Sequence, residues 1–451
     1  MDRFDLDMQL EAIGFGKFHI MAIFVMGYRL FCYGSTNSFL AILEPYLRKH
    51  WHLSYLTATW IVLPEVLLNI PGSILLGRLA DIYGRRKILI LVLILNSYFS
   101  ALYSFSTNLY LMVIIRGFIG LVSSSNVIAY TYLLEILPLS KRKYTSALLI
   151  IFFAGNAYGI FAGKGSLEHL TWRWLVILTE AIPLALGACL MCLVPESPRY
   201  LLASGRTDDA EDSLQRIAKI NGLKEGYKSL LAQSSDGHGK VKQRSDDKTA
   251  YQEQLSRTEI VKRIILVCYM QFLGFLYAAL MRFGAMQFGK NSDLSQEGSC
   301  SVSFTYKYRW ALEISVMLAA FASNWLLGNF TRRHSFYLLI TFLCLCLLPL
   351  YWDISGWLLM MTMALTGLGF AAFNNLVYVC RAELLPTSTR SFGCGISEAA
   401  GQAGACLGQF IALYVYQVSI YLSFGILHGF SVIGIFVLLT LFKETKDTQL
   451  K

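Results

Sequence analysis

Charged side chains are scarce in this 451-residue chain, where Asp, Glu, Lys and Arg together make up 15% of the residues. Hydrophobic residues make up 55% and aromatic residues 14%. Soluble domains carry about 25% charged residues, so lipid must cover part of this chain. The formal charge of +10 does not indicate nucleic-acid binding, because the Lys and Arg residues lie between long apolar stretches and form no basic face.

Recognisable catalytic motifs are also missing. The sequence has no P-loop and no His-Glu-x-x-His helix, which are typical of ATP hydrolysis and of zinc proteases. We therefore expect neither an enzyme nor an ATP-driven pump, and we predict no cofactor and no metal site.

The ten cysteines do not predict a disulfide framework. Nine lie inside apolar stretches, and Cys300, the one on the predicted lumenal side, has no partner there. Cys189 and Cys192 have the spacing of redox proteins, but residues 186–194 form a continuous apolar run. We interpret the cysteines as small, packed hydrophobic residues.

Long apolar runs are abundant. A helix needs about 20 apolar residues to cross about 30 Å of hydrocarbon, and two sets of six such runs occur. They lie at 18–43, 58–80, 87–105, 110–134, 145–165 and 171–194, and at 260–283, 309–330, 334–352, 357–382, 391–416 and 419–442. The predicted fold class is all-α integral membrane, with twelve transmembrane helices in two six-helix bundles.

Polar segments divide the chain and set the predicted domains. The linker between the bundles is rich in Lys, Asp, Ser and Gly and includes the Ser- and Gly-rich tract 234–239. The predicted segments are a cytoplasmic N-terminus over 1–17, an N-terminal bundle over 18–194, a cytoplasmic linker over 195–258, a C-terminal bundle over 259–442 and a cytoplasmic tail over 443–451.

The distribution of basic residues predicts the orientation. Residues 1–17 are acidic and polar and lack a signal peptide, while the loops at 106–109 and 417–418 have no basic residue. Cytoplasmic loops carry an excess of Lys and Arg, so both termini are expected in the cytoplasm. One face then collects Arg78, Arg85, Arg86, Lys87, Lys141, Arg142, Lys143, Arg332, Arg333 and Arg390.

Residues 77–86 read Gly-Arg-Leu-Ala-Asp-Ile-Tyr-Gly-Arg-Arg and join the second and third predicted helices. Gly77 and Gly84 allow close packing and a tight turn, and Asp81 is an anion placed to meet the N-terminus of a neighbouring helix. This pattern resembles the signature of the major facilitator superfamily. The resemblance implies the major facilitator fold, in which two halves rock around a central cavity.

Four further elements resemble the branch of this superfamily that contains sugar porters, organic ion transporters and synaptic vesicle proteins. They follow predicted helices at cytoplasmic ends and are Glu135–Pro138 with Arg142, Pro195–Leu201, Glu383–Thr387 with Arg390, and Glu444–Lys446. Residues 11–18 and Trp172–Trp174 look most like the synaptic vesicle two-related (SVOP-like) group. The resemblance covers nearly the whole chain.

The resemblance implies a cytoplasmic latch of ion pairs, which holds the halves together when the cavity faces outward. The matching positions are Asp81, Arg85, Arg86, Glu135, Arg142, Glu196, Arg199, Glu383, Arg390 and Glu444. Each of them alone could instead be a solvated loop charge, worth at most about 1 kcal/mol per pair. Gly328 and Thr331 stand where the family has Asp and Gly, so a weaker latch is expected in the second half.

Ionisable residues are few within the predicted helices, where they usually face a cavity or a partner. Arg29, Glu65 and Arg116 lie at comparable depth and are predicted to share a cavity; the alternative is a purely structural ion pair between Glu65 and one arginine. Further polar and aromatic residues are predicted to line a substrate cavity: Tyr33, Asn126, Tyr130, Gln271, Tyr277, Asn374, Asn375 and Tyr378.

One departure from the family bears on ion coupling. Many relatives carry in helix one a carboxylate that takes a proton opposite the helix-four arginine, whereas residues 33–37 here read Tyr-Gly-Ser-Thr-Asn. The pair that couples protons in those relatives is therefore incomplete in this stretch. If a proton is carried, Glu65 is the best substitute.

These features predict a monomeric secondary-active or facilitative transporter of a small organic solute, working by alternating access in a plasma or synaptic-type vesicle membrane. Two arginines against one carboxylate favour an anionic or polar neutral solute. The alternative is a transport-deficient, transporter-like binding or scaffold protein of vesicle membranes, which the missing helix-one acid and the degraded second motif suggest.

Overall fold

The computed structural model describes residues 3–54, 57, 59–166, 171–223, 257–292, 300–352, 357–385, 390–415 and 419–441. Almost all of these residues are helical. Glu444 and the tract 234–239 lie outside the described residues.

The first bundle contains six helical passes. The elements are α2 (Lys17–His50), η1 (Thr59–Ile61) with α4 (Leu63–Tyr83), α5 (Arg85–Ser104), α6 (Leu109–Ser123) with α7 (Asn126–Ile136), η2 (Leu139–Ser146) with α8 (Ala147–Ser166), and α9 (Trp172–Val176), η3 (Ile177–Ala181) and α10 (Ile182–Met191). The fourth pass is divided into α6 and α7 by a break at Ser124 and Ser125, and a π turn, η3, interrupts the sixth pass.

The second bundle contains six more passes. They are α14 (Arg257–Ser292), α15 (Cys300–Asn329), α16 (Arg332–Leu347) with η4 (Leu348–Tyr351), α17 (Trp357–Leu384), α18 (Arg390–Phe410) with η6 (Ile411–Val415), and α20 (Ile420–Leu441). Within the described residues the chain therefore makes twelve passes, at the places where the apolar runs predict them.

Ten of these passes are long and apolar enough to cross a membrane by their own composition. The other two are α16, whose α-helical part has 16 residues, and α18, which is rich in Gly, Ser and Ala and carries Glu398, Gln402 and Gln409. The polar side chains of α18 are buried because the helix packs along α14 of its own bundle and α4 of the other. A helix shielded in this way need not be apolar all round.

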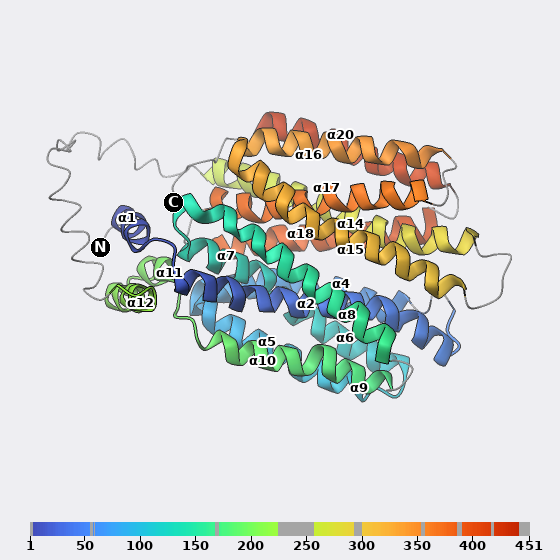
Figure 1. Cartoon of the computed structure of the whole chain (residues 1–451), viewed down its shortest axis with the longest axis horizontal. Helices are drawn as coiled ribbons and strands as arrows, with labels where there is room; N and C mark the ends of the chain where they lie inside the picture. The colour runs from blue at the N-terminus through green and yellow to red at the C-terminus, as the bar shows by residue number, and fades with distance from the viewer. Residues whose placement is uncertain are drawn as a thin grey trace.

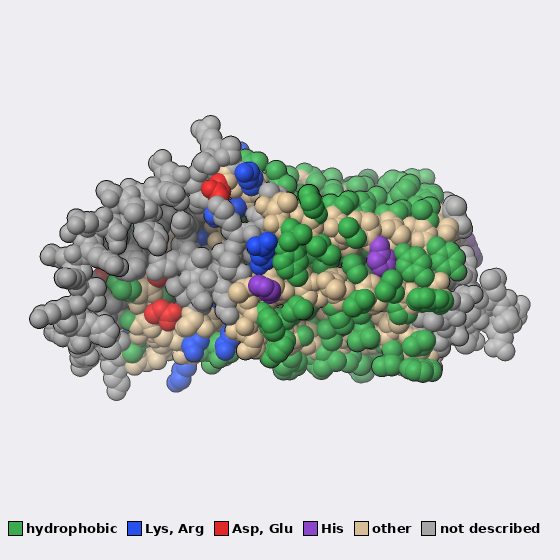
Figure 2. Space-filling model, turned by 90° about the horizontal axis from the view of Figure 1, so that it is seen from above, with side chains coloured by type: hydrophobic (Ala, Val, Ile, Leu, Met, Phe, Trp, Pro, Cys, Tyr) green, Lys and Arg blue, Asp and Glu red, His purple; other side chains and the backbone are tan. Residues whose placement is uncertain are grey.

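The outer surface of the bundles is apolar. Exposed side chains along the passes include Leu75, Phe161, Phe321 and Phe436, which are between 50% and 75% exposed. Figure 2 shows hydrophobic side chains over most of the visible face, with charged side chains gathered toward one end. An apolar surface of this extent is explained by contact with lipid hydrocarbon rather than water.

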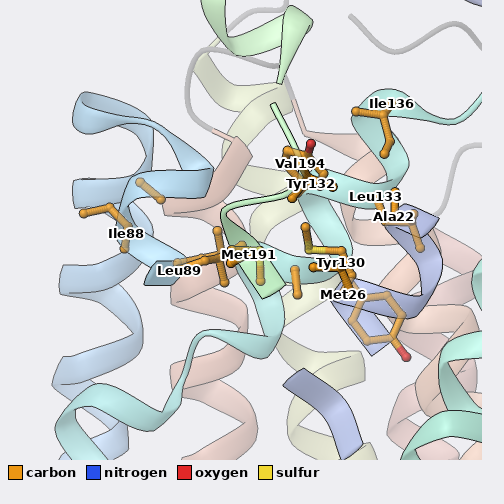
Figure 3. Close-up of a cluster of buried hydrophobic side chains, with 14 of the residues drawn as sticks. Ala22, Met26, Ile88, Leu89, Tyr130, Tyr132, Leu133, Ile136, Met191 and Val194 are labelled. Atoms are coloured by element: carbon orange, nitrogen blue, oxygen red, sulfur yellow. The ribbon is translucent and has the colours of Figure 1, made fainter. Parts of the chain in front are cut away.

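The two bundles lie side by side along the long axis of the molecule. Figure 1 shows α2–α10, in blue to green, mostly below α14–α20, in yellow to red. Each bundle has its own core of buried hydrophobic side chains. Figure 3 shows part of the first core, where Met26 of α2, Leu89 of α5, Tyr132 of α7 and Met191 of α10 converge.

Three further helices cover one end of the first bundle (Figure 1). They are α1 (Arg3–Ile13), α11 (Pro198–Ala203) and α12 (Thr207–Ile220), which pack on one another and on the loops of this end. We call this the latch end and the opposite end the far end. Residues 1–17 and 195–258 are predicted as polar segments, yet they contain helices with an apolar face: α1 buries Leu6 and Leu10, and α12 buries Leu214 and Ile217.

Two glycines bring α4 and α18 into backbone contact across the bundles. A Cβ atom on Gly77 would collide with the carbonyl oxygen of Ser391, and a Cβ atom on Gly395 would collide with that of Ser73. Gly84 has a φ of 108°, a conformation that favours glycine, and it separates α4 from α5. The close packing and the tight turn expected at Gly77 and Gly84 are therefore both present.

Candidate transport cavity and latch

A cavity of about 220 Å³ lies between the two bundles. Its walls come from α2, α4, α7 and α8 on one side and from α14, α15, α17 and α18 on the other. It extends from Tyr130 and Tyr378 toward Glu44, Val62 and Gln409, which lie near the far end. The cavity is thus enclosed by both halves of the chain.

The lining residues follow helical periodicity. On α2 they are Leu30, Tyr33, Asn37, Leu40 and Glu44, which recur every three or four residues. This spacing places them on one face of the helix. The same spacing joins Gln402, Ala405 and Gln409 on α18, so each bundle turns one mixed polar and apolar helix face toward the cavity.

The wall is rich in amides whose oxygen atoms have no partner. The side-chain oxygens of Asn69, Asn126, Asn374 and Gln409 are buried and accept no hydrogen bond from the described residues. Buried polar atoms are normally paired with protein, water or ligand. An unpaired amide in a cavity wall can therefore bind a hydroxyl or amide group of a solute.

Two stacked tyrosines close the cavity toward the latch end. The rings of Tyr130 from the first bundle and Tyr378 from the second lie 4.5 Å apart with an interplanar angle of 9°. The guanidinium carbon of Arg381 lies 3.9 Å from the centroid of the Tyr378 ring, and Arg381 pairs with Glu398 at 3.0 Å. The stack therefore forms a contact between the two bundles at the latch-side end of the cavity.

Six of the eleven residues predicted for the cavity line it. They are Tyr33, Glu65, Asn126, Tyr130, Asn374 and Tyr378. The other five, Arg29, Arg116, Gln271, Tyr277 and Asn375, are buried behind the wall.

Each of these five residues points toward a protein partner. Nε and Nη2 of Arg29 donate to the Ser125 hydroxyl and to the Ser123 carbonyl, both at 2.7 Å, so Arg29 fastens α2 to the break between α6 and α7. Three of the others also form hydrogen bonds with protein groups. The Tyr277 hydroxyl bonds to the Ser431 hydroxyl at 2.7 Å, the Asn375 amide donates to the Ser323 hydroxyl at 3.0 Å, and the Gln271 amide donates to the Glu398 carboxylate at 3.5 Å.

Arg116 forms an ion pair with Glu65, the acid of helix two. Arg116 is fully buried, whereas the Glu65 side chain is 14% exposed and reaches the cavity. Behind the pair lie Tyr103, whose ring is 5.2 Å from the Arg116 guanidinium carbon, and Glu180, which accepts from the Ser100 hydroxyl at 3.2 Å. The Tyr103 hydroxyl, two Arg116 nitrogens and one Glu180 oxygen are buried without a partner among the described residues.

Sequence reasoning missed several polar residues of the wall. Asn37 and Glu44 follow Tyr33 by four and eleven residues, and Asn69 follows Glu65 by four. Gln402 and Gln409 lie seven residues apart on α18, a helix without a predicted cavity residue. Extending each predicted cavity residue along its helix by three, four or seven positions would have found Asn37 and Asn69, but not the other three.

At the latch end, Asp81 binds the N-terminus of α18. Its two carboxylate oxygens accept from the backbone amides of Ser391 at 3.3 Å and Phe392 at 2.8 Å. Asp81 also pairs with Arg85 at 3.1 Å. An anion at a helix N-terminus is stabilised by the unpaired amides and the helix dipole, and here that anion comes from the other bundle.

Glu135 is the centre of the latch. The side chain is fully buried and its Oε1 lies 3.3 Å from both Arg85 of the first bundle and Arg390 of the second. Its Oε2 accepts from the Ser197 hydroxyl at 2.5 Å. Because Arg85 and Arg390 are 1% and 0% exposed, these groups are not solvated loop charges.

Glu196 organises the loop that follows Gly84. One carboxylate oxygen accepts from the backbone amides of Arg85 at 3.0 Å, Arg86 at 3.1 Å and Ser197 at 3.0 Å, so it caps α5. Burial raises the pKa of Glu196 above its usual range, and the hydrogen bonds from these backbone amides oppose the shift. Arg86 in turn donates to the Cys192 carbonyl at 3.0 Å.

The second bundle contributes a reciprocal contact. Arg142, from η2 of the first half, lies 3.7 Å from Glu383 of the second half, which also pairs with Arg332 at 3.4 Å. Arg199 pairs with Asp7 of α1 and donates to the Glu135 carbonyl at 2.9 Å. The structure thus brings together all the predicted latch residues that it describes.

Twelve passes around a cavity with mixed polar and apolar walls, closed at one end by buried ion pairs between the halves, define a multi-pass membrane transporter of the major facilitator type. The family described as "Sugar (and other) transporter" matches residues 18–451, and the chain belongs to that family. Its members are transporters rather than enzymes. The family resemblance that the motifs indicated is confirmed.

Similar proteins support this assignment. Synaptic vesicle 2-related protein of Bos taurus is 24% identical over 463 residues, covering 100% of this chain and 83% of the relative. The putative transporter SVOPL of Mus musculus is 28% identical and covers 99% and 93%. Among solved structures, the proton:xylose symporter XylE bound to 6-bromo-6-deoxy-D-glucose shares the fold, with a TM-score of 0.72, 17% identity and coverage of 96% and 98%.

Proposed function

We propose that this chain transports a small, neutral organic solute rich in hydroxyl or amide groups, by alternating access between the two bundles. The observation that carries the proposal is the set of six amide side chains in the otherwise mostly apolar wall of a cavity that both halves line, next to the Tyr130–Tyr378 stack. The relative named as a putative transporter agrees with a transport role, and the structural neighbour named as a proton:xylose symporter binds a solute of this class.

The charges of the wall favour a neutral solute over an anion. Among the lining residues, Glu44 and Glu65 are carboxylates and none is Lys or Arg. The two arginines that suggested an anionic solute from the sequence, Arg29 and Arg116, lie behind the wall and bind protein groups. An anion would therefore meet negative side chains without a basic partner in contact.

The latch supplies the second part of the proposal. Opening toward the latch end requires the loss of the Asp81 contact with α18 and of the two cross-bundle pairs, Glu135 with Arg390 and Arg142 with Glu383. These contacts belong to one state of the transporter only. They bias the population toward the state in which the cavity reaches the far end.

We further propose a proton as the coupling ion. The buried cluster behind the wall holds one guanidinium, Arg116, and two carboxylates, Glu65 and Glu180. One cation balances one carboxylate, so the cluster can hold a proton on the other. Glu65 reaches the cavity and can exchange that proton with solvent, which places in helix two the acid that helix one lacks.

The latch end is proposed to face the cytoplasm, because the short basic loops lie there. The same orientation places α1, α11 and α12 in the cytoplasm. The similarity to synaptic vesicle 2-related proteins favours a vesicle membrane.

Uptake into proteoliposomes tests the transport proposal. Labelled neutral polyols and sugars should accumulate, and organic anions should not. Asn374→Ala should weaken uptake about two- to tenfold through the loss of one hydrogen bond to the solute, whereas Asn329→Ala, an exposed amide outside the cavity, should not. Binding of such solutes without any uptake would instead support the alternative of a transport-deficient binding or scaffold protein.

Proton coupling has its own test. In the parent, uptake should rise when the outside pH is lowered, and Glu65→Gln should remove this dependence while solute binding persists. Arg116→Gln leaves Glu65 and Glu180 without their cation and should make uptake more sensitive to pH. If parent uptake does not respond to a proton gradient, the cluster is structural and transport is facilitative.

A further inference from the structure

Two cysteines on the sixth pass differ from the others in exposure. Of the nine free cysteines that the structure describes, Cys189 and Cys192 are exposed and the other seven are buried or half-buried. The interpretation of every cysteine as a packed core residue is therefore wrong for these two. Their exposure makes these two thiols accessible to chemical modification.

Cys189 belongs to the lipid-facing stripe of α10. Ile182 and Leu186 are 54% and 50% exposed, and Ile182, Leu186 and Cys189 follow one another at intervals of four and three residues. This spacing places the three side chains on one helix face. Because their apolar neighbours are so exposed, the face contacts hydrocarbon.

Both thiols lie where the pass leaves the membrane. The helix α10 ends at Met191, so Cys189 occupies its last turn and Cys192 follows directly. Arg86 donates to the carbonyls of Met191 at 3.4 Å and Cys192 at 3.0 Å, and Lys87 beside it is exposed. Basic side chains at this level mark the membrane boundary at the latch end.

We propose that Cys189 and Cys192 are sites of S-acylation by a long-chain fatty acid. Cysteines at the membrane boundary of a cytoplasmic face are typical acceptors of this modification. The donor would be a fatty acyl coenzyme A, which is found in the cytoplasm, so the proposal uses the orientation proposed above but does not depend on the transported solute.

The reaction is an acyl transfer without oxidation or reduction. The sulfur of the cysteine attacks the thioester carbonyl carbon of the donor and forms a new carbon–sulfur bond. The bond to coenzyme A breaks, and the departing thiolate takes up the proton that the cysteine loses. The attached chain can then lie along Leu186 and Ile182, where hydrocarbon contact already exists.

An acyl-exchange assay on the full chain expressed in animal cells tests this proposal. Free thiols are blocked, thioesters are cleaved with hydroxylamine, and the released thiols are coupled to a maleimide polymer that adds a fixed mass. The parent should show two mass increments that require hydroxylamine. Cys189→Ser and Cys192→Ser should each show one, and the double variant should show none.

The matched control is Cys346→Ser, a buried cysteine of α16, which should keep both increments. Membrane expression of the double variant, measured in parallel, separates loss of modification from loss of protein. The proposal is overturned if the parent shows no hydroxylamine-dependent increment, or if the increments persist in the double variant. Thiols released by a reducing agent but not by hydroxylamine would indicate a disulfide and would also contradict it.

Discussion

The two halves of the molecule contribute unequally to the latch. On the first half, Asp81 reaches across to the α18 N-terminus and Glu135 binds an arginine from each bundle. On the second half, Glu383 likewise binds Arg332 and Arg142, one from each bundle. The position equivalent to Asp81, four residues before Arg332, is Gly328, so the second motif has no acid at the position from which Asp81 caps the opposite helix.

The second motif shows which contacts can be kept when the sequence departs from the family pattern. Thr331 stands where the first motif has Gly84, and its side chain caps α16 by accepting from the backbone amide of His334. Arg332 remains buried and paired with Glu383. The second motif has therefore kept its turn and its ion pair and lost only the contact that Asp81 makes, which leaves the first half as the stronger side of the latch.

The largest effect is expected from Glu135→Gln. The substitution removes the only carboxylate that contacts both Arg85 and Arg390 within the described residues, leaving two buried guanidiniums with less compensation. Removing one partner of a buried ion network costs about 3–5 kcal/mol. The equivalent Glu383→Gln should cost less, because its contact with Arg142 is longer, at 3.7 Å. Thermal unfolding of both variants in detergent measures the difference, and equal losses would contradict the asymmetry.

A smaller effect is expected from Asp81→Asn. The amide can still accept one hydrogen bond from the α18 N-terminus but loses the negative charge that favours that position. Such a charge contributes up to about 2 kcal/mol in a partly buried site, which corresponds to more than a tenfold shift in population. Labelling of a cysteine introduced behind the Tyr130–Tyr378 stack should become faster from the latch end. Unchanged labelling from both ends would show that Asp81 does not hold the latch.

Gly328→Asp should strengthen the latch on the side of the second bundle, which is the weaker one. A Cβ atom at Gly328 would meet no other atom within 4 Å, and α15 packs against η2, which leads into α8. We expect the new acid to stabilise the latched state by about 0.3–1 kcal/mol and to slow labelling from the latch end. Gly328→Ala is the control for the side chain itself. If both variants behave alike, the missing acid is not the reason for the asymmetry.

The last prediction concerns the orientation, and it is that Asn329 carries no glycan. Asn329, Phe330 and Thr331 form the one glycosylation acceptor triplet of the sequence, and Asn329 lies at the latch end. A cytoplasmic latch end leaves this asparagine unmodified. A mobility shift that a glycosidase removes would place both latch motifs on the lumenal side.

Much of the fold follows from the sequence because lipid imposes a simple rule. Each pass needs about 20 apolar residues, and the motifs at 77–86 and 135–138 place Asp81 and Glu135 at one end. The sequence also predicts the polar pass α18, because residues 391–416 contain one charged side chain, Glu398. The helix α1 is not predicted, because its 11 residues depend on docking against Arg199 and η2 rather than on a long apolar run.

The cavity could be predicted only in part, because the rotation of each helix is set by packing. Asn374 and Asn375 are adjacent and equally polar, yet Asn374 lines the cavity and Asn375 donates to Ser323 on α15. In an α-helix, neighbouring side chains point about 100° apart. The sequence contains both asparagines but does not state which of them faces the other bundle.

The distance between the two bundles at the latch end tests the central claim most directly. Spin labels at Lys87 and His334, both exposed there, report it in a background where the native cysteines are replaced. The parent should show mainly one short distance, and Glu135→Gln should add a second, longer population that grows when a transported solute is present. An identical distance distribution in the parent and in Glu135→Gln, with and without solute, would contradict a latch that opens for transport.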